Sequence, residues 1–401
     1  MSPRLRILFI VEDITMAQVV RLVFLARALD PARYEVHFAS AHFDELIFGD
    51  TDFVRHSIYT VPAAYAFRRL ERGQRLYEHH VLEKYVEDEL ALFASIRPHA
   101  VIGDLRFSLS VSAPHAGIPY AALINAYWSR AMIRESFPLP EHPIVSLLGQ
   151  EFAGRYFFKA LPWVFKHFAA PVNKLRKRYG LAPLGDLIDL LMFGDRTLFP
   201  DIPRLTPLSV QAPSEVFLGP ILWEPRVTPP AWWNDAQLDG PSAYVTLGSS
   251  GRLDRLPATL AGLGALGIPL LVATAGRIAE SELASGLYTA PFLAGSEAAQ
   301  RTSFTVCNGG SSTAYQALAQ GKPVLGIASN LDQYLAMTAV RDAGAGILLR
   351  ADSLTADAVT AAARQLLEQP KYRLAAEGIA VELRGYDCHE RFASVLHSLG
   401  A

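Results

Sequence analysis

Short apolar segments rich in β-branched residues alternate along this chain with longer segments whose apolar residues recur every three or four positions. This alternation is typical of parallel βαβ units rather than of a β-sandwich. In the first half we predict strands at Arg6–Val11, Tyr34–Ala39, Ala100–Asp104 and Tyr120–Asn125. In the second half we predict strands at Ala243–Leu247, Pro269–Ala273, Phe304–Cys307, Pro323–Ile327 and Gly346–Leu349. The pattern predicts an α/β protein whose sheets carry helices on both faces.

A proline-rich segment without periodicity separates the two series of predicted strands. Residues 217–240 contain four prolines, a composition typical of connections between domains. The length of 401 residues also suits about two domains. We therefore predict an N-terminal domain over residues 1–216, a linker over 217–240 and a C-terminal domain over 241–401, whose last helix could pack back on the N-terminal domain. Two α/β domains facing one another would bind ligands in a cleft at the carboxyl ends of their strands.

Charge and cysteine content exclude several classes of partner. The 37 Lys and Arg residues nearly balance the 39 Asp and Glu residues, so we expect no nucleic-acid partner. Two cysteines are too few for a four-thiolate metal site, and we expect no metal. The first apolar run stops at Glu12 and Asp13, too early for a signal peptide, and no stretch reaches the roughly 18 apolar residues of a membrane span. We expect a cytoplasmic protein without a transmembrane segment.

The segment Phe304–Ile327 carries the most informative pattern. A predicted strand runs into the sequence Asn-Gly-Gly-Ser-Ser-Thr (residues 308–313), and a predicted helix follows. Paired glycines let the backbone approach a ligand closely, and the unpaired N–H groups of a helix N-terminus attract anions. The loop therefore predicts a phosphate site, although Gly309 and Gly310 could also serve only a tight strand-to-helix turn.

Two further loops follow predicted strands of the same half of the chain. Ser249 and Ser250 lie in a glycine-flanked loop that could bind the same phosphate group. Asp332 and Gln333 place a carboxylate beside an amide, a combination suited to the hydroxyls of a sugar, or to an ordinary surface turn. The loop after the first predicted strand lacks glycine, which argues against a dinucleotide-binding fingerprint, and the chain has no P-loop motif.

Residues 308–318 resemble the donor-binding signature of the family 1 glycosyltransferases of the GT-B fold, H-G-G-x-G-T-x-x-E-A-L, which is followed by G-x-P and a D-Q pair. The register matches without gaps through Thr313, Ala317, Leu318, Gly321, Pro323, Asp332 and Gln333. Residues 244–249, 173–184 and 218–220 are similar to further segments of the family. The resemblance implies two Rossmann-like domains facing across a cleft.

The resemblance also implies roles for individual residues in binding a UDP- or dTDP-sugar donor. Its diphosphate would be held by Ser249, Ser250, Asn308, Gly309, Gly310, Ser311, Ser312 and Thr313. Gln316 would bind the ribose, and Asp332 with Gln333 would bind the sugar. The family has glutamate where this chain has Gln316, which offers one acceptor oxygen instead of two. Because deoxyribose lacks the 2′-hydroxyl, Gln316 suits a dTDP-sugar at least as well as a UDP-sugar.

Other departures concern catalysis. Asn308 replaces the signature histidine, and Ser312 replaces a glycine. The catalytic histidine of the family aligns with Gln18, which cannot act as a base near neutral pH. Asp104 matches the aspartate that orients this histidine, so it could act directly or through Gln18 and a water. Asp13, just beyond the first predicted strand, is the second candidate base. Both aspartates could instead be helix caps or solvated loop residues.

The resemblance implies a metal-independent, inverting glycosyltransferase that needs no cofactor besides its nucleotide-sugar co-substrate. Aromatic residues favour a small, apolar or aromatic hydroxylated acceptor, and they are Phe67, Phe107, Tyr127, Trp128 and Trp163. The aromatic stretch Arg155–Phe168 could be a lid, an acceptor surface, a membrane-facing patch or a helix packed on the core. The alternatives for function are a non-catalytic binding or partner protein of this family and a nucleotide-sugar epimerase of similar architecture.

Overall fold

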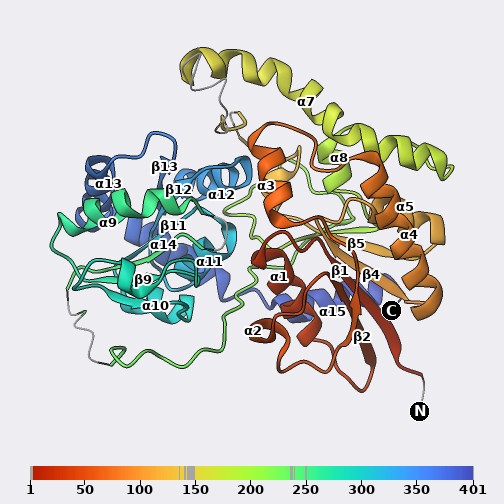
Figure 1. The fold of residues 1–401 in the computed structure, drawn as a ribbon, viewed down its shortest axis with the longest axis horizontal. Coiled ribbons are helices and arrows are strands. Elements are labelled where there is room, and N and C mark those ends of the chain that lie inside the picture. The colour runs from red at the N-terminus through yellow and green to blue at the C-terminus, as the bar shows by residue number, and fades with distance from the viewer. Residues whose placement is uncertain are drawn as a thin grey trace. The chain divides into compact units, whose positions relative to one another are not determined.

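The computed structural model describes residues 3–134, 136–139, 141, 150–234, 238, 240–248 and 251–400. The chain divides into two compact units, each built on one sheet (Figure 1). The first unit comprises residues 1–136, 142–219 and 387–401, and the second comprises residues 137–141 and 220–386. Within the described residues, no helix is long and apolar enough to cross a membrane.

The sheet of the first unit has seven strands in the order β3-β2-β1-β4-β5-β6-β7, and every neighbouring pair is parallel. The strands are β1 (Leu5–Val11), β2 (Tyr34–Ser40), β3 (Val54–Ser57), β4 (Ala100–Asp104), β5 (Tyr120–Leu123), β6 (Arg196–Phe199) and β7 (Glu215–Phe217). Val11 at the end of β1 lies in register with Asp104 at the end of β4. The segments that follow β1, β2 and β4 therefore meet at one edge of the sheet.

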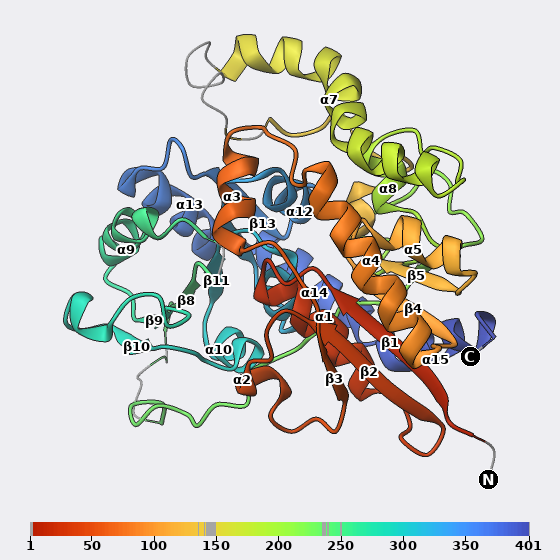
Figure 2. The same cartoon turned by 45° about the vertical axis from the view of Figure 1, so that its right-hand side comes forward.

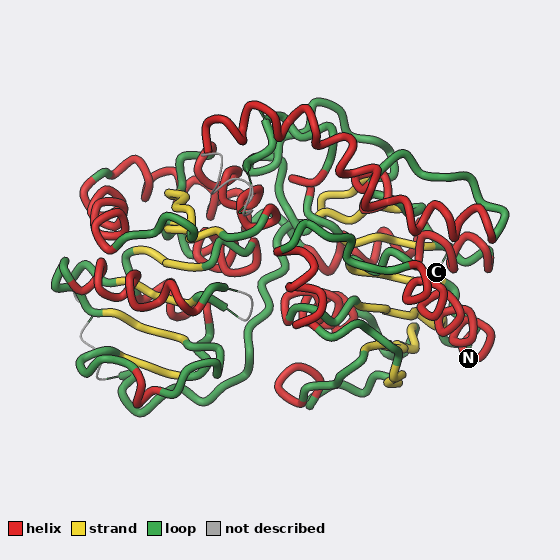
Figure 3. The backbone as a smooth tube through the Cα atoms, turned by 45° about the horizontal axis from the view of Figure 1, so that its top comes forward, coloured by secondary structure: helices red, strands yellow, loops and turns green. Residues whose placement is uncertain are grey.

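Helices flank this sheet, as Figure 3 shows by colour. They are α1 (Met16–Arg27), α2 (Glu45–Phe48), α3 (Ala63–Glu71), α4 (His79–Ile96), α5 (Leu109–Ala116), the 3-10 turn η1 (Ala126–Trp128), α7 (Gln150–Arg178), α8 (Leu187–Leu191) and α15 (Cys388–Ser398). The last helix of the chain, α15, belongs to the first unit, where the ring of Phe392 lies 6.1 Å from the ring of Phe9 in β1. The end of the chain thus completes the core of the first unit.

The sheet of the second unit has six parallel strands in the order β10-β9-β8-β11-β12-β13. The strands are β8 (Ala243–Thr246), β9 (Leu270–Ala273), β10 (Tyr288–Ala290), β11 (Phe304–Cys307), β12 (Val324–Ala328) and β13 (Gly346–Arg350). The helices, several of which are labelled in Figure 2, are the 3-10 turns η2 (Leu253–Arg255) and η3 (Glu280–Glu282), and α9 (Leu256–Gly264), α10 (Gly295–Arg301), α11 (Ser311–Ala319), α12 (Leu331–Asp342), α13 (Ala356–Glu368) and α14 (Pro370–Leu383). Thr246 and Cys307 are in register, so the loops after β8 and β11 leave the sheet side by side.

The α/β class and the parallel sheets agree with the sequence prediction, but four strands were not predicted. These strands, β3, β6, β7 and β10, are only three or four residues long and contain polar residues, so they lack an apolar run. The aromatic stretch Arg155–Phe168, for which a helix packed on the core was one of the predicted alternatives, lies within α7, a helix of 29 residues that contains Pro162 and Pro171. Burial of one face of this helix on the first unit outweighs the cost of two interior prolines.

Candidate functional site

The loop between β11 and α11 has the form of an anion-binding site. Gly309 has a φ of +80°, and a Cβ atom there would lie 2.8 Å from Cγ of Met337, so this position requires glycine. Gly310 occupies the N-cap position of α11 and provides no side-chain cap. The N-cap residue therefore contributes no side-chain acceptor to the first-turn amides of α11, at Ser311, Ser312 and Thr313.

Asn308 joins this loop to the loop after β8. Its side chain is buried, and Oδ1 accepts a hydrogen bond from the backbone N–H of Gly310 at 3.1 Å. Gly248 has a φ of +60°, and a Cβ atom there would lie 3.7 Å from Nδ2 of Asn308. The structure thus brings together two of the loops that the sequence singled out. Ser249 and Ser250 lie outside the described residues.

Arg277 supports the loop after β8 and was not predicted. Its Nη1 atom donates to the carbonyl of Gly248 at 3.0 Å and to the carbonyl of Gly251 at 2.8 Å. Partial burial lowers the pKa of Arg277 from its ordinary value. Arg277 follows β9, the strand beside β8, so its place at this edge could have been found from the strand order.

Gln316 lies on the second turn of α11 with a fixed amide orientation. Its Nε2 donates to the backbone carbonyl of Trp223 at 2.8 Å, which identifies the other amide atom as the oxygen. A Cβ atom on Gly295 would lie 2.4 Å from Oε1 of Gln316, so this oxygen rests against the bare backbone at the start of α10. Gln316 therefore has one acceptor atom, Oε1, whose position is set by two neighbouring segments.

Asp332 and Gln333 open α12 in different environments. Asp332 is exposed, whereas Gln333 is buried. Oε1 of Gln333 accepts from the backbone N–H and the hydroxyl of Ser329 at 2.9 and 3.0 Å, and the N–H of Gln333 donates to Asn330, the N-cap residue. Oε1 of Gln333 is thus used in hydrogen bonds to Ser329, in the turn before α12. A contact between this pair and a sugar stays a prediction.

Asp104 in the first unit is the counter-ion of a buried arginine. Arg21 of α1 donates to both carboxylate oxygens, with Nε to Oδ2 at 2.9 Å and Nη2 to Oδ1 at 2.8 Å. Both side chains are buried, and Arg21 also donates to Asn125 at 2.7 Å. A carboxylate held at both oxygens by a guanidinium is poorly arranged to accept a further proton. The sequence placed Asp104 ahead of Asp13 as the candidate base. The geometry does not favour this order.

Gln18 is part of the N-terminal cap of α1. Its Oε1 accepts from the backbone N–H of Thr15 at 2.9 Å and from the Thr15 hydroxyl at 3.2 Å. Together with the bond from the N–H of Gln18 to the Thr15 side chain, these contacts form a capping box. Oε1 of Gln18 is therefore occupied by hydrogen bonds that cap α1. A role of Gln18 in relaying a proton stays a prediction.

Asp13 is held from one side by the segment after β2. Its Oδ2 accepts from the backbone N–H of His42 at 3.1 Å, from the hydroxyl of Ser40 at 3.3 Å, and contacts Nδ1 of His42 at 3.0 Å. The described contacts of Asp13 all involve Oδ2, which leaves Oδ1 as its second acceptor atom. The Asp13 side chain is 16% exposed and that of His42 is 84% exposed, so this pair meets solvent.

His42 was missed in the sequence because 29 residues separate it from Asp13. The order of the strands in the sheet explains why His42 and Asp13 lie close together. In this sheet β2 lies directly beside β1, and both strands run in the same direction. His42 comes two residues after β2 and Asp13 two residues after β1, so both leave the same edge of the sheet.

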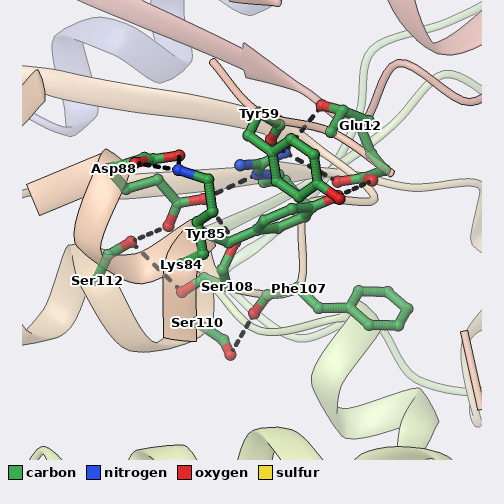
Figure 4. A network of polar contacts seen from close by, with 12 residues as sticks. Glu12, Tyr59, Lys84, Tyr85, Asp88, Phe107, Ser108, Ser110 and Ser112 are labelled. Carbon is green, nitrogen blue, oxygen red and sulfur yellow. Dashed lines mark hydrogen bonds and ion pairs between the residues drawn. The ribbon is translucent and has the colours of Figure 1, made fainter. Parts of the chain in front are cut away.

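Glu12 turns into the interior, where it joins a buried polar network (Figure 4). Arg106 donates to Glu12 at 3.1 Å and to Glu89 at 2.8 Å, and the Tyr85 hydroxyl donates to Glu12 at 2.8 Å. Glu89 accepts two further hydrogen bonds, from the hydroxyls of Ser108 and Ser112. Burial raises the pKa of Glu12 to about 7 despite the charge of Arg106, and it raises the pKa of Glu89 as well. One arginine between two buried carboxylates thus offsets only part of the effect of burial on their pKa values.

The aromatic residues proposed for the acceptor lie in different surroundings. Tyr127 is buried, and the Phe107 ring packs against the Tyr77 ring at 5.5 Å. In α7, Phe165 is buried whereas Trp163 is 69% exposed. The stretch Arg155–Phe168 is thus a helix with one packed face, and the acceptor site stays a prediction. Among the described residues, no group of three or more His, Cys, Asp or Glu side chains could hold a metal ion.

Comparison with known proteins gives consistent matches. Residues 264–397 match the family model described as erythromycin biosynthesis protein CIII-like, C-terminal domain. A PGL/p-HBAD biosynthesis glycosyltransferase of Mycobacterium tuberculosis (strain H37Ra) is 42% identical over 379 residues, which cover 94% of this chain and 88% of that protein. A PGL/p-HBAD biosynthesis rhamnosyltransferase of Mycobacterium bovis (strain BCG) is 43% identical over 378 residues, covering 94% of this chain and 84% of that protein.

Solved structures are similar over the whole chain. The spinosyn forosaminyltransferase SpnP superposes with a TM-score of 0.72 at 17% sequence identity and covers all of both chains. The glycosyltransferase VinC, solved in complex with DTDP, superposes with a TM-score of 0.68 at 20% identity, covering 99% of this chain and 100% of that chain. At this level of identity, these likenesses show a shared fold.

Proposed function

We infer that this chain transfers its sugar from a nucleoside diphosphate with inversion. The chain belongs to the family 1 glycosyltransferases of the GT-B fold and is a glycosyltransferase. The observation that carries the proposal is the N-terminus of α11, whose N-cap is the glycine Gly310, beside Asn308 and Gly309. In the transfer step, the C1–O bond to the diphosphate breaks and negative charge builds on the leaving group. Amides already directed at that position stabilise the charge.

We propose a dTDP-sugar as the donor. Gln316 has a single oriented acceptor, which is enough for the 3′-hydroxyl that ribose and deoxyribose share. VinC was solved with DTDP and a spinosyn rhamnosyltransferase with thymidine diphosphate, and both share the fold of this chain. One relative is named a rhamnosyltransferase, which supports a deoxyhexose such as rhamnose as the sugar.

Asp13 is the proposed base. The acceptor hydroxyl would give its proton to Oδ1 of Asp13 as its oxygen attacks C1 of the sugar, while the nucleoside diphosphate leaves. The contacts of Oδ2 with Ser40 and His42 fix the orientation of the carboxylate. A positioned carboxylate accelerates such a proton transfer by roughly 10²–10⁴-fold. We propose a small hydroxylated acceptor that is apolar or aromatic.

One relative supports a second candidate function, binding of the nucleotide sugar without turnover. An inactive PGL/p-HBAD biosynthesis glycosyltransferase of Mycobacterium bovis (strain BCG) is 43% identical over 263 residues, which cover 65% of this chain and 71% of that protein. That match is shorter than the matches to the two relatives that are not named inactive.

Donor hydrolysis and transfer distinguish the two candidates. The chain is incubated with dTDP-rhamnose, dTDP-glucose, UDP-glucose and a panel of phenolic acceptors, and the release of nucleoside diphosphate is followed. We expect slow release without acceptor and faster release with at least one phenol. Tight donor binding with no release under either condition would overturn the proposed transfer and favour the binding protein.

A further inference from the structure

The outer face of α7 carries a row of lysines around one tryptophan. Exposed residues recur along the helix at intervals of three and four, the spacing of a single helix face, and they are Lys159, Trp163, Lys166, Ala170, Lys174 and Lys177. The opposite face packs on α4, α5 and α8 through buried residues such as Val172 and Leu175 (Figure 2). We call these six exposed residues the lysine face of α7.

Charge is strongly one-sided in this segment. The sequence from residue 152 to residue 185 contains no Asp or Glu, although the whole chain has a net charge of -2. Arg176 in the same helix turns inward and donates to the carbonyl of Ala182 at 2.7 Å, so it does not belong to the exposed row. The positive charges of the lysine face therefore stand together without interspersed acidic residues of their own helix.

Trp163 adds an apolar anchor at this face. It is the most exposed of the large hydrophobic side chains in the described chain, at 69%. Its ring stacks on the His167 ring at a centroid distance of 5.5 Å, which holds the indole against the helix while leaving most of it in solvent. An amphipathic indole beside long lysine side chains suits the interface between water and lipid, where the indole enters the headgroup layer and the ammonium groups stay in water.

We propose that the lysine face of α7 docks this chain on the surface of an anionic lipid bilayer. From Lys159 to Lys177 the row extends about 27 Å along the helix at about 1.5 Å per residue. Positive charge spread along such a line, with an exposed indole among the lysines, complements a planar layer of anionic headgroups over an apolar interior. Surface docking of this kind needs no spanning helix. It is also independent of the proposed donor and base, because lipid binding is measured without turnover.

Vesicle binding of paired variants tests the proposal. Sedimentation of the full chain is compared on vesicles of phosphatidylcholine alone and on vesicles containing about a third of phosphatidylglycerol, at low salt and at high salt. The double variant Lys166→Gln/Lys174→Gln removes two charges from the lysine face. The control Lys84→Gln/Lys371→Gln removes two charges from exposed lysines on α4 and α14. Trp163→Ala removes the anchor, and circular dichroism shows whether each variant is folded.

We expect the wild type to bind the anionic vesicles and not the neutral ones. Each lysine near an anionic surface strengthens binding about fivefold, so the lysine-face double variant should bind about 25-fold more weakly and the control should match the wild type. Trp163→Ala should also bind more weakly, including at high salt. Absence of binding to anionic vesicles, or equal losses in the two double variants, would overturn the proposal. Binding of an acidic protein with no binding of vesicles would overturn it in favour of a protein partner.

Discussion

Replacing Gln316 by alanine tests how the nucleoside is recognised. The hydrogen bond from Nε2 of Gln316 to the Trp223 carbonyl leaves only Oε1 to accept from a sugar hydroxyl. One neutral hydrogen bond contributes about 0.5–1.5 kcal/mol to the binding free energy, so its loss should raise the dissociation constant roughly 2- to 13-fold. If Oε1 meets the 3′-hydroxyl, the loss should be equal for dTDP and UDP. If it meets the 2′-hydroxyl, only UDP should bind more weakly.

Isothermal titration calorimetry measures both nucleotides on the wild type and on Gln316→Ala. Gln320→Ala is the matched control, because Gln320 is a partly buried glutamine at the other end of the same helix. We expect the control to bind like the wild type and the wild type to bind dTDP at least as tightly as UDP. A loss confined to UDP, or unchanged binding of both nucleotides to Gln316→Ala, would refute the reasoning about a single shared hydroxyl.

Three further predictions concern the first unit. Asp13→Asn should lower kcat at least about tenfold in a transfer assay and leave the dissociation constant of dTDP unchanged, and wild-type turnover would exclude Asp13 as the base. Asp104→Ala should lower the free energy of unfolding in urea by about 3–5 kcal/mol, because it leaves the buried Arg21 without its carboxylate, and a cost below 1 kcal/mol would show that the pair is not structural. Glu12 binds its proton more tightly in the folded chain than in the unfolded chain, so its contribution should fall as pH rises from about 4.5 to about 7. Relative to Glu12→Gln, the wild type should therefore lose stability between pH 5 and pH 8, and a constant difference would contradict the raised pKa.

The loop between β11 and α11 could be predicted because its information is local. Residues 304–323 contain the strand, the paired glycines, the helix and the stop at Gly321 in one continuous stretch. The period of apolar residues and the special conformations of glycine therefore suffice to place an N-terminus of a helix at the end of a strand. The long apolar strands, such as β1 and β12, could be predicted for the same reason.

The surroundings of the candidate bases could not be predicted because they depend on strand order. The neighbours of Asp13 come from β2, and the guanidinium on Asp104 comes from α1, 83 residues earlier in the chain. Nothing in the local pattern of residues 100–104 distinguishes a carboxylate bound to a buried arginine from one open to a substrate. Arg21 itself occupies a position in an amphipathic helix where a solvated arginine would be just as consistent with the sequence.

The most direct test of the donor site is a titration of dTDP into Gly310→Asp. Gly310 is the N-cap of α11 with extended backbone, a conformation that aspartate adopts readily in this position. A Cβ atom there would lie 3.2 Å from Oδ1 of Asn308, a close contact that Gly310→Asp and Gly310→Asn share, so the comparison of the two variants isolates the charge. The new carboxylate should cap the first-turn amides and repel the diphosphate, so we predict a folded chain with a loss of dTDP affinity of at least about 100-fold. Gly310→Asn, which caps without charge, should lose less affinity. Wild-type affinity in a folded Gly310→Asp chain would contradict the assignment of this helix terminus to the diphosphate.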